Sequence, residues 1–273
     1  MRLAHLSDLH FGRHDPAVAA GLAADLAAQR PDLIVVSGDF TQLGTAQEFA
    51  LAKNFLDSLP APLFAVPGNH DIGKQPLRRF LNPYGYFRHY IAPEIEPFLA
   101  QDGVALAGLN TTRRFHLDRN WSEGTIDRHQ LAQLRQRFAA APADAVRIVV
   151  AHHPLMVPAL PGANPHTEVK RSALALEAFA DLGVRLVLSG HFHLSFVRKY
   201  EANAIRDGIP PGPRQAAAAP VLVAQASSTI STRLRGEPNS YNLVDIVDGV
   251  ITIHAREWGE AGWATKEDAL VAG

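Results

Sequence analysis

Residues 32–39 read DLIVVSGD, and this stretch decides the fold that the sequence predicts. Four apolar residues follow one another at positions 33–36, and three of the four are β-branched. A continuous apolar run of this length is typical of a strand buried in a parallel sheet that helices cover on its faces. We therefore predict a buried strand over residues 32–37 in an α/β fold, with Gly38 and Asp39 where the strand ends.

The segments on both sides of this stretch alternate between short apolar runs and longer helical patterns. Such alternation is typical of an α/β sheet with helices on its faces. Further strands are predicted over residues 2–6, 63–66, 104–109, 147–151 and 184–189, and helices over residues 16–30, 45–59, 127–140 and 172–182.

The last third of the chain has a different pattern. Residues 221–225, 241–247 and 250–255 read as strands, and Asp248-Gly249 between the last two is typical of a hairpin turn. A β-rich end after an α/β body predicts a second, more antiparallel sheet that packs on the first.

Chain length and irregular segments bear on the domain organisation. The chain has 273 residues, 47% of them hydrophobic, which is enough for one large domain or two small ones. We predict a single domain over residues 1–273, with residues 74–97 and 154–169 as cap or rim segments over a site, because both interrupt the regular pattern. For the second segment, an ordinary surface excursion is an equally good interpretation.

Charge and cysteine content exclude several functions. The formal net charge is −1, without the basic excess of a nucleic-acid binder, so no nucleic-acid polymer is expected as a partner. Cysteine is absent, which excludes disulfides and thiolate metal sites. The first residues lack a signal-peptide pattern, and no run approaches the roughly 18 apolar residues of a membrane span. We therefore expect a cytoplasmic protein that does not bind membranes.

Five short polar clusters follow, in order, the ends of predicted strands. They are Asp8-Leu9-His10, Gly38-Asp39, Gly68-Asn69-His70-Asp71, His152-His153-Pro154 and Gly190-His191-Phe192-His193. The carboxyl ends of strands are where open α/β sheets bind ligands. Positions two apart at a strand end point to the same side, so Asp8 with His10, and His191 with His193, each converge on one point.

The side chains in these clusters are typical of a metal site. Carboxylate, imidazole and amide groups suit Mn, Fe, Zn or Co, rather than soft-sulfur metals or an all-oxygen calcium site. Seven such ligands exceed what one ion needs, so we predict two ions that share the carboxylate of Asp39. Each cluster alone has an ordinary structural explanation, such as a helix cap, a turn or a buried histidine. All five in order, each at a strand end, favour the metal site.

The order D-x-H, G-D, G-N-H-D, H and G-H-x-H resembles the calcineurin-like metallophosphoesterases. The likeness runs from Asp8 to His193, and residues 228–242 also resemble the C-terminal strand region of the bacterial phosphodiesterase branch. The resemblance implies a fold of two packed mixed β-sheets flanked by helices, an α/β/β/α sandwich.

The resemblance also implies a role for each polar side chain. The first metal would be held by Asp8, His10, Asp39 and His193, and the second by Asp39, Asn69, His152 and His191. His153 is the alternative to His152. The family pattern of histidine, one residue and proline favours His152. His70 would not be a ligand; it would stand over the scissile phosphate as the catalytic group and donate a hydrogen bond or a proton.

Departures from other branches of the family favour a phosphodiesterase. Gln42 stands where purple acid phosphatases carry a tyrosine ligand, and His10 where their first motif ends in glycine. Lipid A precursor hydrolases typically have arginine in place of His70. The closest likeness is to the bacterial class III branch, the phosphodiesterases of cyclic nucleotides and glycerophosphodiesters, although many of its members have aspartate where this chain has Gln42.

We expect this site to hydrolyse a small phosphodiester of cyclic-nucleotide or glycerophosphodiester type by attack of a hydroxide that bridges the two metal ions. A phosphomonoesterase or nucleotide pyrophosphatase on the same metal centre is the alternative. A non-catalytic scaffold is disfavoured because no ligand is missing. By analogy with the family, residues 74–97 would mediate contacts in a homo-oligomer.

Residues outside the five clusters are weaker candidates for substrate contacts. Candidate phosphate or base contacts are Arg113, Arg233 and Arg235, although a solvated surface arginine is the commoner role. Candidates for an aromatic wall beside the substrate are Tyr84, Tyr86, Phe87 and His89, with ordinary packing as an equally good interpretation.

Overall fold

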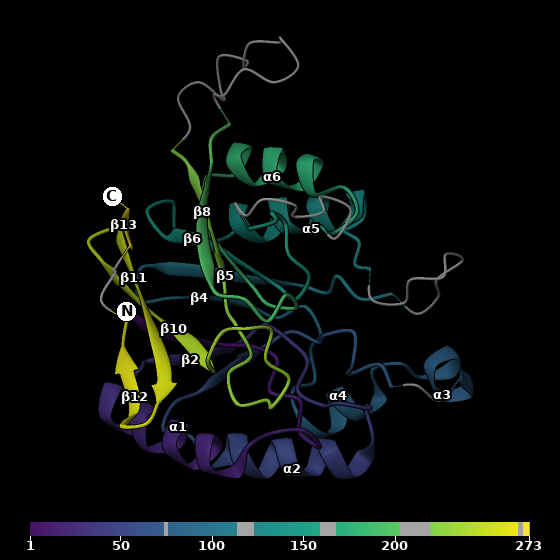
Figure 1. Ribbon diagram of the computed structural model, residues 1–273. Coiled ribbons are helices and arrows are strands. Elements are labelled where there is room, and N and C mark those ends of the chain that lie inside the picture. The colour runs from purple at the N-terminus through teal and green to yellow at the C-terminus, as the bar shows by residue number, and fades with distance from the viewer. Residues whose placement is uncertain (74–75, 114–122, 159–167, 203–218, 267–269, 273) are drawn as a thin grey trace.

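Two β-sheets pack face to face in the computed structural model, and helices cover the outer face of each sheet (Figure 1). The structure describes residues 1–73, 76–113, 123–158, 168–202, 219–266 and 270–272. The arrangement confirms the predicted α/β/β/α sandwich of two mixed sheets.

The first sheet has the strand order β12-β11-β10-β1-β2-β3, and β13 also pairs with β11. Strands β1, β2 and β3 are parallel, whereas β10, β11 and β12 are joined antiparallel. Asp248 and Gly249, both with positive φ, form the predicted hairpin turn between β10 and β11. The bounds are β1 Arg2–Leu6, β2 Leu33–Val36, β3 Leu63–Ala65, β10 Ser240–Val247, β11 Val250–Gly259, β12 Gly262–Thr265 and β13 Leu270–Ala272.

The second sheet has the strand order β4-β5-β6-β7-β9-β8. Its four central strands are parallel, and the two edge strands, β4 and β8, are antiparallel to their neighbours. The bounds are β4 Phe98–Gln101, β5 Val104–Leu109, β6 Val146–Ala151, β7 Val184–Ser189, β8 Phe196–Tyr200 and β9 Val221–Gln225.

The helices lie on the outer faces of the sandwich. α1 (Pro16–Gln29), α2 (Ala46–Asp57) and α4 (Gly85–Tyr90) pack on the first sheet, and α5 (Arg128–Ala139) and α6 (Ser172–Asp181) on the second (Figure 1). α3 (Pro76–Leu81) projects away from both sheets. Capping side chains mark where three helices begin: Asp15 for α1, Thr45 for α2 and Asp127 for α5 accept hydrogen bonds from first-turn N–H groups.

The core between the sheets explains why the central strands are largely apolar. Leu3 and Val35 of the first sheet share one buried cluster with Ile148 and Leu188 of the second. Adjacent positions on the same strands face the helices instead, as Ile34 does in the cluster beneath α1 and α2. Since both faces of these strands are buried, the ends of the strands are where polar side chains gather.

Within the expected rim segment 74–97, the described residues 76–97 are more regular than the sequence predicted. They include α3 and α4, and Phe87 of α4 is fully buried beside Phe40. Each helix is six residues long, which is too short to display a helical period in the sequence. Of the other expected rim segment, residues 159–167 lie outside the described residues.

Candidate metal centre

The five polar clusters meet at the carboxyl ends of parallel strands. Asp8 and His10 follow β1, Asp39 follows β2 and Asn69 follows β3 in the first sheet. His152 follows β6, and His191 and His193 follow β7, in the second sheet. Because the two sheets present these ends side by side, all seven predicted ligands come together.

One group of donor atoms gathers around the Oδ1 atom of Asp8. This oxygen lies 3.5 Å from the Nε2 atom of His10 and 3.6 Å from the Nε2 atom of His193. The two imidazole rings are stacked, with centroids 5.2 Å apart and planes 3° from parallel. All three residues are buried, so the structure places the predicted first-metal ligands around one point.

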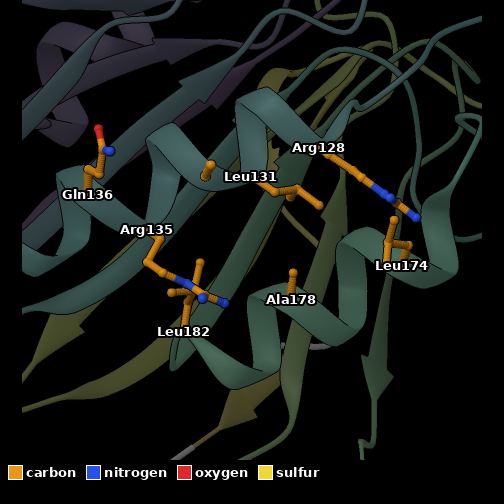
Figure 2. Close-up of a pocket in the computed structure, with 8 residues that line it drawn as sticks. Arg128, Leu131, Arg135, Gln136, Leu174, Ala178 and Leu182 are labelled. Atoms are coloured by element: carbon orange, nitrogen blue, oxygen red, sulfur yellow. The ribbon is translucent and has the colours of Figure 1, made fainter.

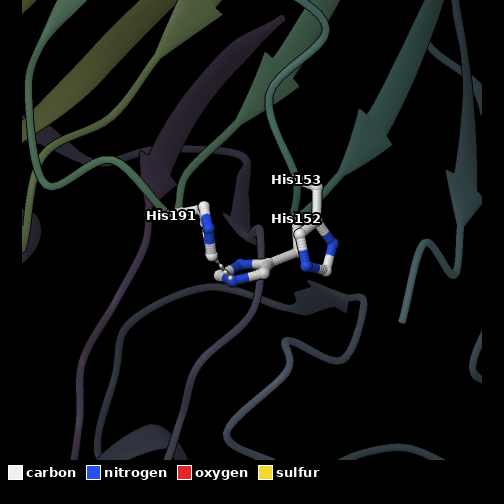
Figure 3. A group of neighbouring side chains, drawn as sticks. All are labelled: His152, His153 and His191. Carbon is white, nitrogen blue, oxygen red and sulfur yellow. Dashed lines mark hydrogen bonds between the residues drawn. The ribbon is translucent and has the colours of Figure 1, made fainter. Parts of the chain in front are cut away.

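A second group gathers around the side-chain oxygen of Asn69. Its Oδ1 atom is 3.0 Å from the Nε2 atom of His152 and 3.1 Å from the Nδ1 atom of His191. These two nitrogens are 3.3 Å apart, and Figure 3 shows the two rings meeting edge to face. The predicted second-metal ligands therefore also lie together.

Asp39 lies between the two groups. Its Oδ2 atom is 3.8 Å from the Nε2 atom of His10, in the first group, and 3.4 Å from the Nε2 atom of His152, in the second. Donors bound at about 2.1 Å to a tetrahedral or octahedral ion lie about 3.0 to 3.4 Å from one another. The observed spacings are close to that range, so the carboxylate of Asp39 is placed to serve both groups.

Hydrogen bonds from the protein orient the three ring ligands that use Nε2. The Nδ1 atom of His10 is 3.3 Å from the Thr41 carbonyl oxygen, and that of His152 is 2.8 Å from the Ser37 carbonyl oxygen. The Nδ1 atom of His193 is bonded to the Ser228 hydroxyl. Since a carbonyl only accepts, Nδ1 of His10 and His152 carries a proton, which leaves Nε2 as the nitrogen that would bind a metal.

In the carboxylates of Asp8 and Asp39, as in these rings, the protein binds one polar atom and leaves the other facing the site. The Oδ2 atom of Asp8 accepts hydrogen bonds from the Ser7 hydroxyl at 2.7 Å and the His191 backbone N–H at 2.8 Å. The Oδ1 atom of Asp39 accepts from the His70 backbone N–H at 2.8 Å. In each carboxylate one oxygen is held by the protein and the other faces the donor groups.

Unpartnered polar atoms show that these residues fit a bound cation. Among the residues that the structure describes, the Oδ1 atom of Asp8 and the Nε2 atom of His10 are buried without a hydrogen-bond partner. Buried polar atoms are normally bonded, because leaving one unpaired costs about 1–3 kcal/mol. Both atoms face the first donor group, so a metal ion would supply the missing interaction.

The backbone at the ligands is strained. Five of the seven have positive φ: Asp8 at 53°, His10 at 46°, Asp39 at 55°, His191 at 78° and His193 at 56°. Few non-glycine residues adopt this conformation, although aspartate and histidine do so more readily than most. Such residues cluster at functional sites, where the surrounding structure holds them in place.

Two glycines beside the ligands leave room that a side chain would fill. A Cβ atom at Gly38 would lie 2.6 Å from the Nδ1 atom of His152, and Gly38 has a φ of 105°. A Cβ atom at Gly190 would collide with the Ser7 hydroxyl and come 2.6 Å from the Oδ2 atom of Asp8. The glycines of these clusters therefore allow a close approach that a side chain would block.

The electrostatics of the site keep the carboxylates ionised. Burial opposes ionisation, but His193 beside Asp8 and His152 beside Asp39 hold the pKa of each carboxyl below its usual value. Burial lowers the pKa of His191 to about 3. Burial also acts to lower the pKa of His152, but Asp39 outweighs it and raises that pKa to about 9. A metal at His152 would therefore displace a proton from Nε2.

His70 and His153 stand beside the donor groups in different settings. The Nδ1 atom of His70 is 2.6 Å from the Gln42 carbonyl oxygen, and its ring meets the His10 ring edge-on, with centroids 4.8 Å apart. The Nδ1 atom of His153 is 2.7 Å from the Thr111 hydroxyl (Figure 3 shows its ring beside the other two). His153 is near enough to His152 and His191 to form a further ligand group with them.

The aromatic wall predicted from residues 84–89 is wrong for its two buried members. Phe87 is fully buried in the core beneath the first sheet. Tyr84 is also buried, and its hydroxyl is 2.8 Å from the Thr112 hydroxyl. Tyr86 packs against Phe49. Packing, the alternative interpretation, accounts for these rings.

The three arginine candidates are placed differently. The guanidinium of Arg113 donates to the Thr125 hydroxyl. Arg235 is exposed. An Nη atom of Arg233 is 3.3 Å from the Nε2 atom of His70, at the metal centre.

Asp71 has a structural role that the sequence pattern did not predict. Its carboxylate accepts from the Thr41 backbone N–H at 3.1 Å, the Thr41 hydroxyl at 3.0 Å and the Gly68 backbone N–H at 2.8 Å. It therefore joins the loop after β2 to the loop after β3. Burial, with Asp39 nearby, raises the pKa of this carboxyl to about 7. Its place in Gly-Asn-His-Asp was the one available signal.

A hollow elsewhere on the surface is not part of this site. It has a volume of about 550 Å³ and lies between α5 and α6, with Arg128, Leu131 and Leu174 among its lining residues (Figure 2). None of the predicted ligands lines it. We place the site at the histidines and carboxylates, because the hollow gathers no comparable set of donor atoms.

A two-sheet sandwich with aspartate, asparagine and histidine gathered at its strand ends is the architecture of the metallophosphoesterases. The chain belongs to the calcineurin-like phosphoesterase family, whose sequence model matches residues 1–195.

Curated relatives and a solved structure resemble the chain. It is 26% identical over 171 residues to the "Probable glycerophosphodiester phosphodiesterase GpdQ" of Arcobacter nitrofigilis, covering 60% of this chain and 57% of that protein. It is 26% identical to a "Probable cyclic nucleotide phosphodiesterase" of Synechococcus sp., covering 72% and 75%. The purple acid phosphatase from yellow lupin (Lupinus luteus) seeds shares the fold, with a TM-score of 0.69 at 9% identity, over 99% of this chain and 53% of that one.

Within the described residues, no helix combines the length and the apolar character that crossing a membrane requires.

Proposed function

We propose that this protein is a metal-dependent phosphodiesterase that holds two transition-metal ions at the strand ends. The observation that carries the proposal is the pair of donor groups joined by Asp39, whose Oδ2 atom lies 3.8 Å from His10 and 3.4 Å from His152. Asp8, His10 and His193 would complete the first site, and Asn69, His152 and His191 the second. The mixture of imidazole, carboxylate and amide donors favours Mn, Fe or Zn.

Two bound ions would offset the charge on the phosphoryl oxygens and supply a nucleophile at neutral pH. The protein's part is to hold the ligands in place before substrate arrives. Thr41, Ser37 and Ser228 orient the rings of His10, His152 and His193, so that each Nε2 lone pair points into the site. Such support of the ligands commonly tunes metal affinity and activity.

His70 would act on the leaving group. Its Nδ1 atom donates to the Gln42 carbonyl. The nitrogen that can gain or lose a proton is therefore Nε2, next to the donor groups. A proton carried on Nε2 could pass to the leaving oxygen, and a positioned general acid of this kind contributes roughly 10² to 10⁴ in rate. Burial lowers the pKa of His70, which would make the protonated ring a stronger acid towards the leaving oxygen.

A diester is the proposed substrate because both curated relatives described above carry phosphodiesterase names. We propose a small cyclic-nucleotide or glycerophosphodiester substrate, a single domain over residues 1–273 and a cytoplasmic location. The exposed side chains of Leu77, Phe80 and Leu81 on α3 support the proposal that residues 74–97 contact another subunit.

Chromogenic esters test the proposed reaction. The purified protein is loaded with Mn and assayed with bis(4-nitrophenyl) phosphate and with 4-nitrophenyl phosphate. Faster cleavage of the diester supports the proposal. Faster cleavage of the monoester supports a phosphomonoesterase on the same centre, and no cleavage of either by a protein that carries two ions would reject both.

A further inference from the structure

The loop between β9 and β10 brings a cation to the metal centre. Residues 226–239 are tied to the loop after β1: the Asp15 N–H donates to the Ile230 carbonyl, and the Thr232 N–H to the Arg13 carbonyl, both at 2.8 Å. At its far end, Glu237 accepts a hydrogen bond from the Ser195 N–H at 2.7 Å. The loop is therefore fastened on two sides of the site.

The backbone of Arg233 is held within this loop. Its N–H donates to the Ser231 hydroxyl at 3.1 Å, and its carbonyl accepts from the Ser228 hydroxyl at 3.2 Å. The same Ser228 hydroxyl is bonded to the Nδ1 atom of His193. The Ser228 hydroxyl thus links the backbone of Arg233 to His193, a predicted metal ligand.

The guanidinium of Arg233 meets neutral groups. One Nη atom is 3.3 Å from the Nε2 atom of His70 and 3.5 Å from the Oε1 atom of Gln42. Across the described part of the chain, Arg233 forms no ion pair with a carboxylate, whereas the guanidiniums of Arg2 and Arg256 each pair with an aspartate. A half-buried cation beside the catalytic histidine, without a carboxylate of its own, is well placed to bind an anion.

We propose that Arg233 binds an anionic phosphoryl oxygen of the substrate and thereby sets the affinity of the site for phosphate esters. The inference rests on the proposed function. When substrate binds, the guanidinium would exchange its contacts with His70 and Gln42 for the phosphoryl oxygen. That exchange would leave the Nε2 atom of His70 facing the leaving group.

The other two arginine candidates lack this placement. The guanidinium of Arg113 is bonded to Thr125. Arg235 belongs to the same loop as Arg233 but is exposed. Arg235→Ala is therefore a matched control, since it removes the same charge from the same loop without touching the site.

The test measures phosphate binding as well as turnover. Wild type, Arg233→Ala, Arg233→Lys and Arg235→Ala are loaded with Mn and their metal content is measured by elemental analysis. Isothermal titration calorimetry gives the affinity for inorganic phosphate, and assays with bis(4-nitrophenyl) phosphate give KM and kcat. For Arg233→Ala we expect unchanged metal content and a roughly ten- to hundredfold loss of phosphate affinity, the range for a hydrogen bond to a charged group.

A comparable rise in KM is expected for Arg233→Ala, with part of the loss recovered in Arg233→Lys and no change in Arg235→Ala. Phosphate affinity within about twofold of wild type in Arg233→Ala, or a fall in kcat alone, would overturn the inference. Loss of metal from Arg233→Ala would overturn it too, because the residue would then support the centre through Ser228. Arg233-dependent phosphate binding in a protein that cleaves no ester would support the inference and reject the proposed function.

Discussion

Asp39 has two oxygens with two different environments. Oδ1 accepts from the His70 N–H, whereas Oδ2 faces His10 and His152. This division explains how one carboxylate can serve two ions and still fix the loop that carries His70. It also allows the proposed metal-binding role of Asp39 and the proposed catalytic role of His70 to be separated by experiment.

Asp39→Ala is expected to lose both metal ions, because the carboxylate shared by the two donor groups is gone. Elemental analysis after loading with Mn measures the loss directly. Asn69→Ala is the matched comparison, since it removes a ligand of the second group only and should keep one ion. Two retained ions in Asp39→Ala would contradict the shared role.

His70→Ala is expected to keep both ions and to lose roughly 10²- to 10⁴-fold in kcat, the usual contribution of a positioned general acid. Diester hydrolysis and metal content are measured on the same sample. His153→Ala, the neighbouring buried histidine, is the comparison for ring removal at the site. If His70→Ala emptied the metal sites, the residue would be a ligand rather than the catalytic group.

His5 provides a pH-dependent contribution to stability. Its Nε2 atom is 3.0 Å from the Ser37 hydroxyl, and burial lowers its pKa from 6.5 to about 3, although Asp8 acts in the opposite direction. The unfolded chain therefore takes up this proton first. The stabilising effect is complete above pH 6.5 and is lost as the pH falls from 6.5 towards 3.

His5→Gln should remove that dependence. Urea unfolding between pH 5 and pH 7 is expected to show a steeper fall of the unfolding free energy for wild type than for the variant, by up to about 1.4 kcal/mol per pH unit. Equal slopes for the two proteins would show that His5 takes up its proton equally in the folded and unfolded states.

At the level of elements, the N-terminus of α2 supports the loop that contains Gln42, the hydrogen-bond partner of His70. Thr45 and Glu48 form a capping box, and Glu48 also accepts from the Leu43 N–H at 2.9 Å. The loop with Gln42, whose carbonyl accepts from His70, is therefore ordered by the first turn of the helix. A helix cap here contributes both to stability and to the geometry of the site.

Thr45→Ala is expected to lower the unfolding free energy by about 1 kcal/mol, the usual cost of losing a cap, and to reduce diester turnover. Asp127→Ala removes the matching cap of α5, which is not part of the site, and should cost similar stability at unchanged turnover. Urea unfolding and the diester assay distinguish the two. Equal turnover in both variants would show that the Thr45 cap does not affect the site.

Not every element was visible in the sequence. The central strands were predicted because they are buried on both faces and apolar throughout, as β2 and β5 are. The edge strands β4, β8 and β12 are mostly half-buried or exposed, so they carry no continuous apolar run. The helices α3 and α4 are each about a turn and a half long, which is too short for a periodic pattern.

For the whole molecule, the candidate metal centre draws its residues from both sheets. The first group combines Asp8 and His10 of the first sheet with His193 of the second, and the second group combines Asn69 with His152 and His191. A bound ion would therefore hold together two halves that otherwise meet through their apolar core.

Removal of metal is expected to lower the melting temperature by several degrees, because an ion that binds only the folded state adds a few kcal/mol at saturating concentration. Differential scanning calorimetry before and after chelation measures this, and added Mn should restore the transition. Asp39→Ala serves as the control and should not respond to either treatment. An unchanged melting temperature in chelated wild type would contradict the bridging of the sheets.

The sequence by itself determined the fold class and the set of chemically competent side chains. Continuous apolar runs require burial on both faces, and the polar clusters after those runs have nowhere to lie but at the strand ends. Tertiary structure alone decided which of three arginines reaches the site, because the loop that carries Arg233 is held there by hydrogen bonds from Thr232 to the Arg13 carbonyl, 219 positions away in the chain. Contacts of that range leave no pattern in the local sequence, whereas burial does.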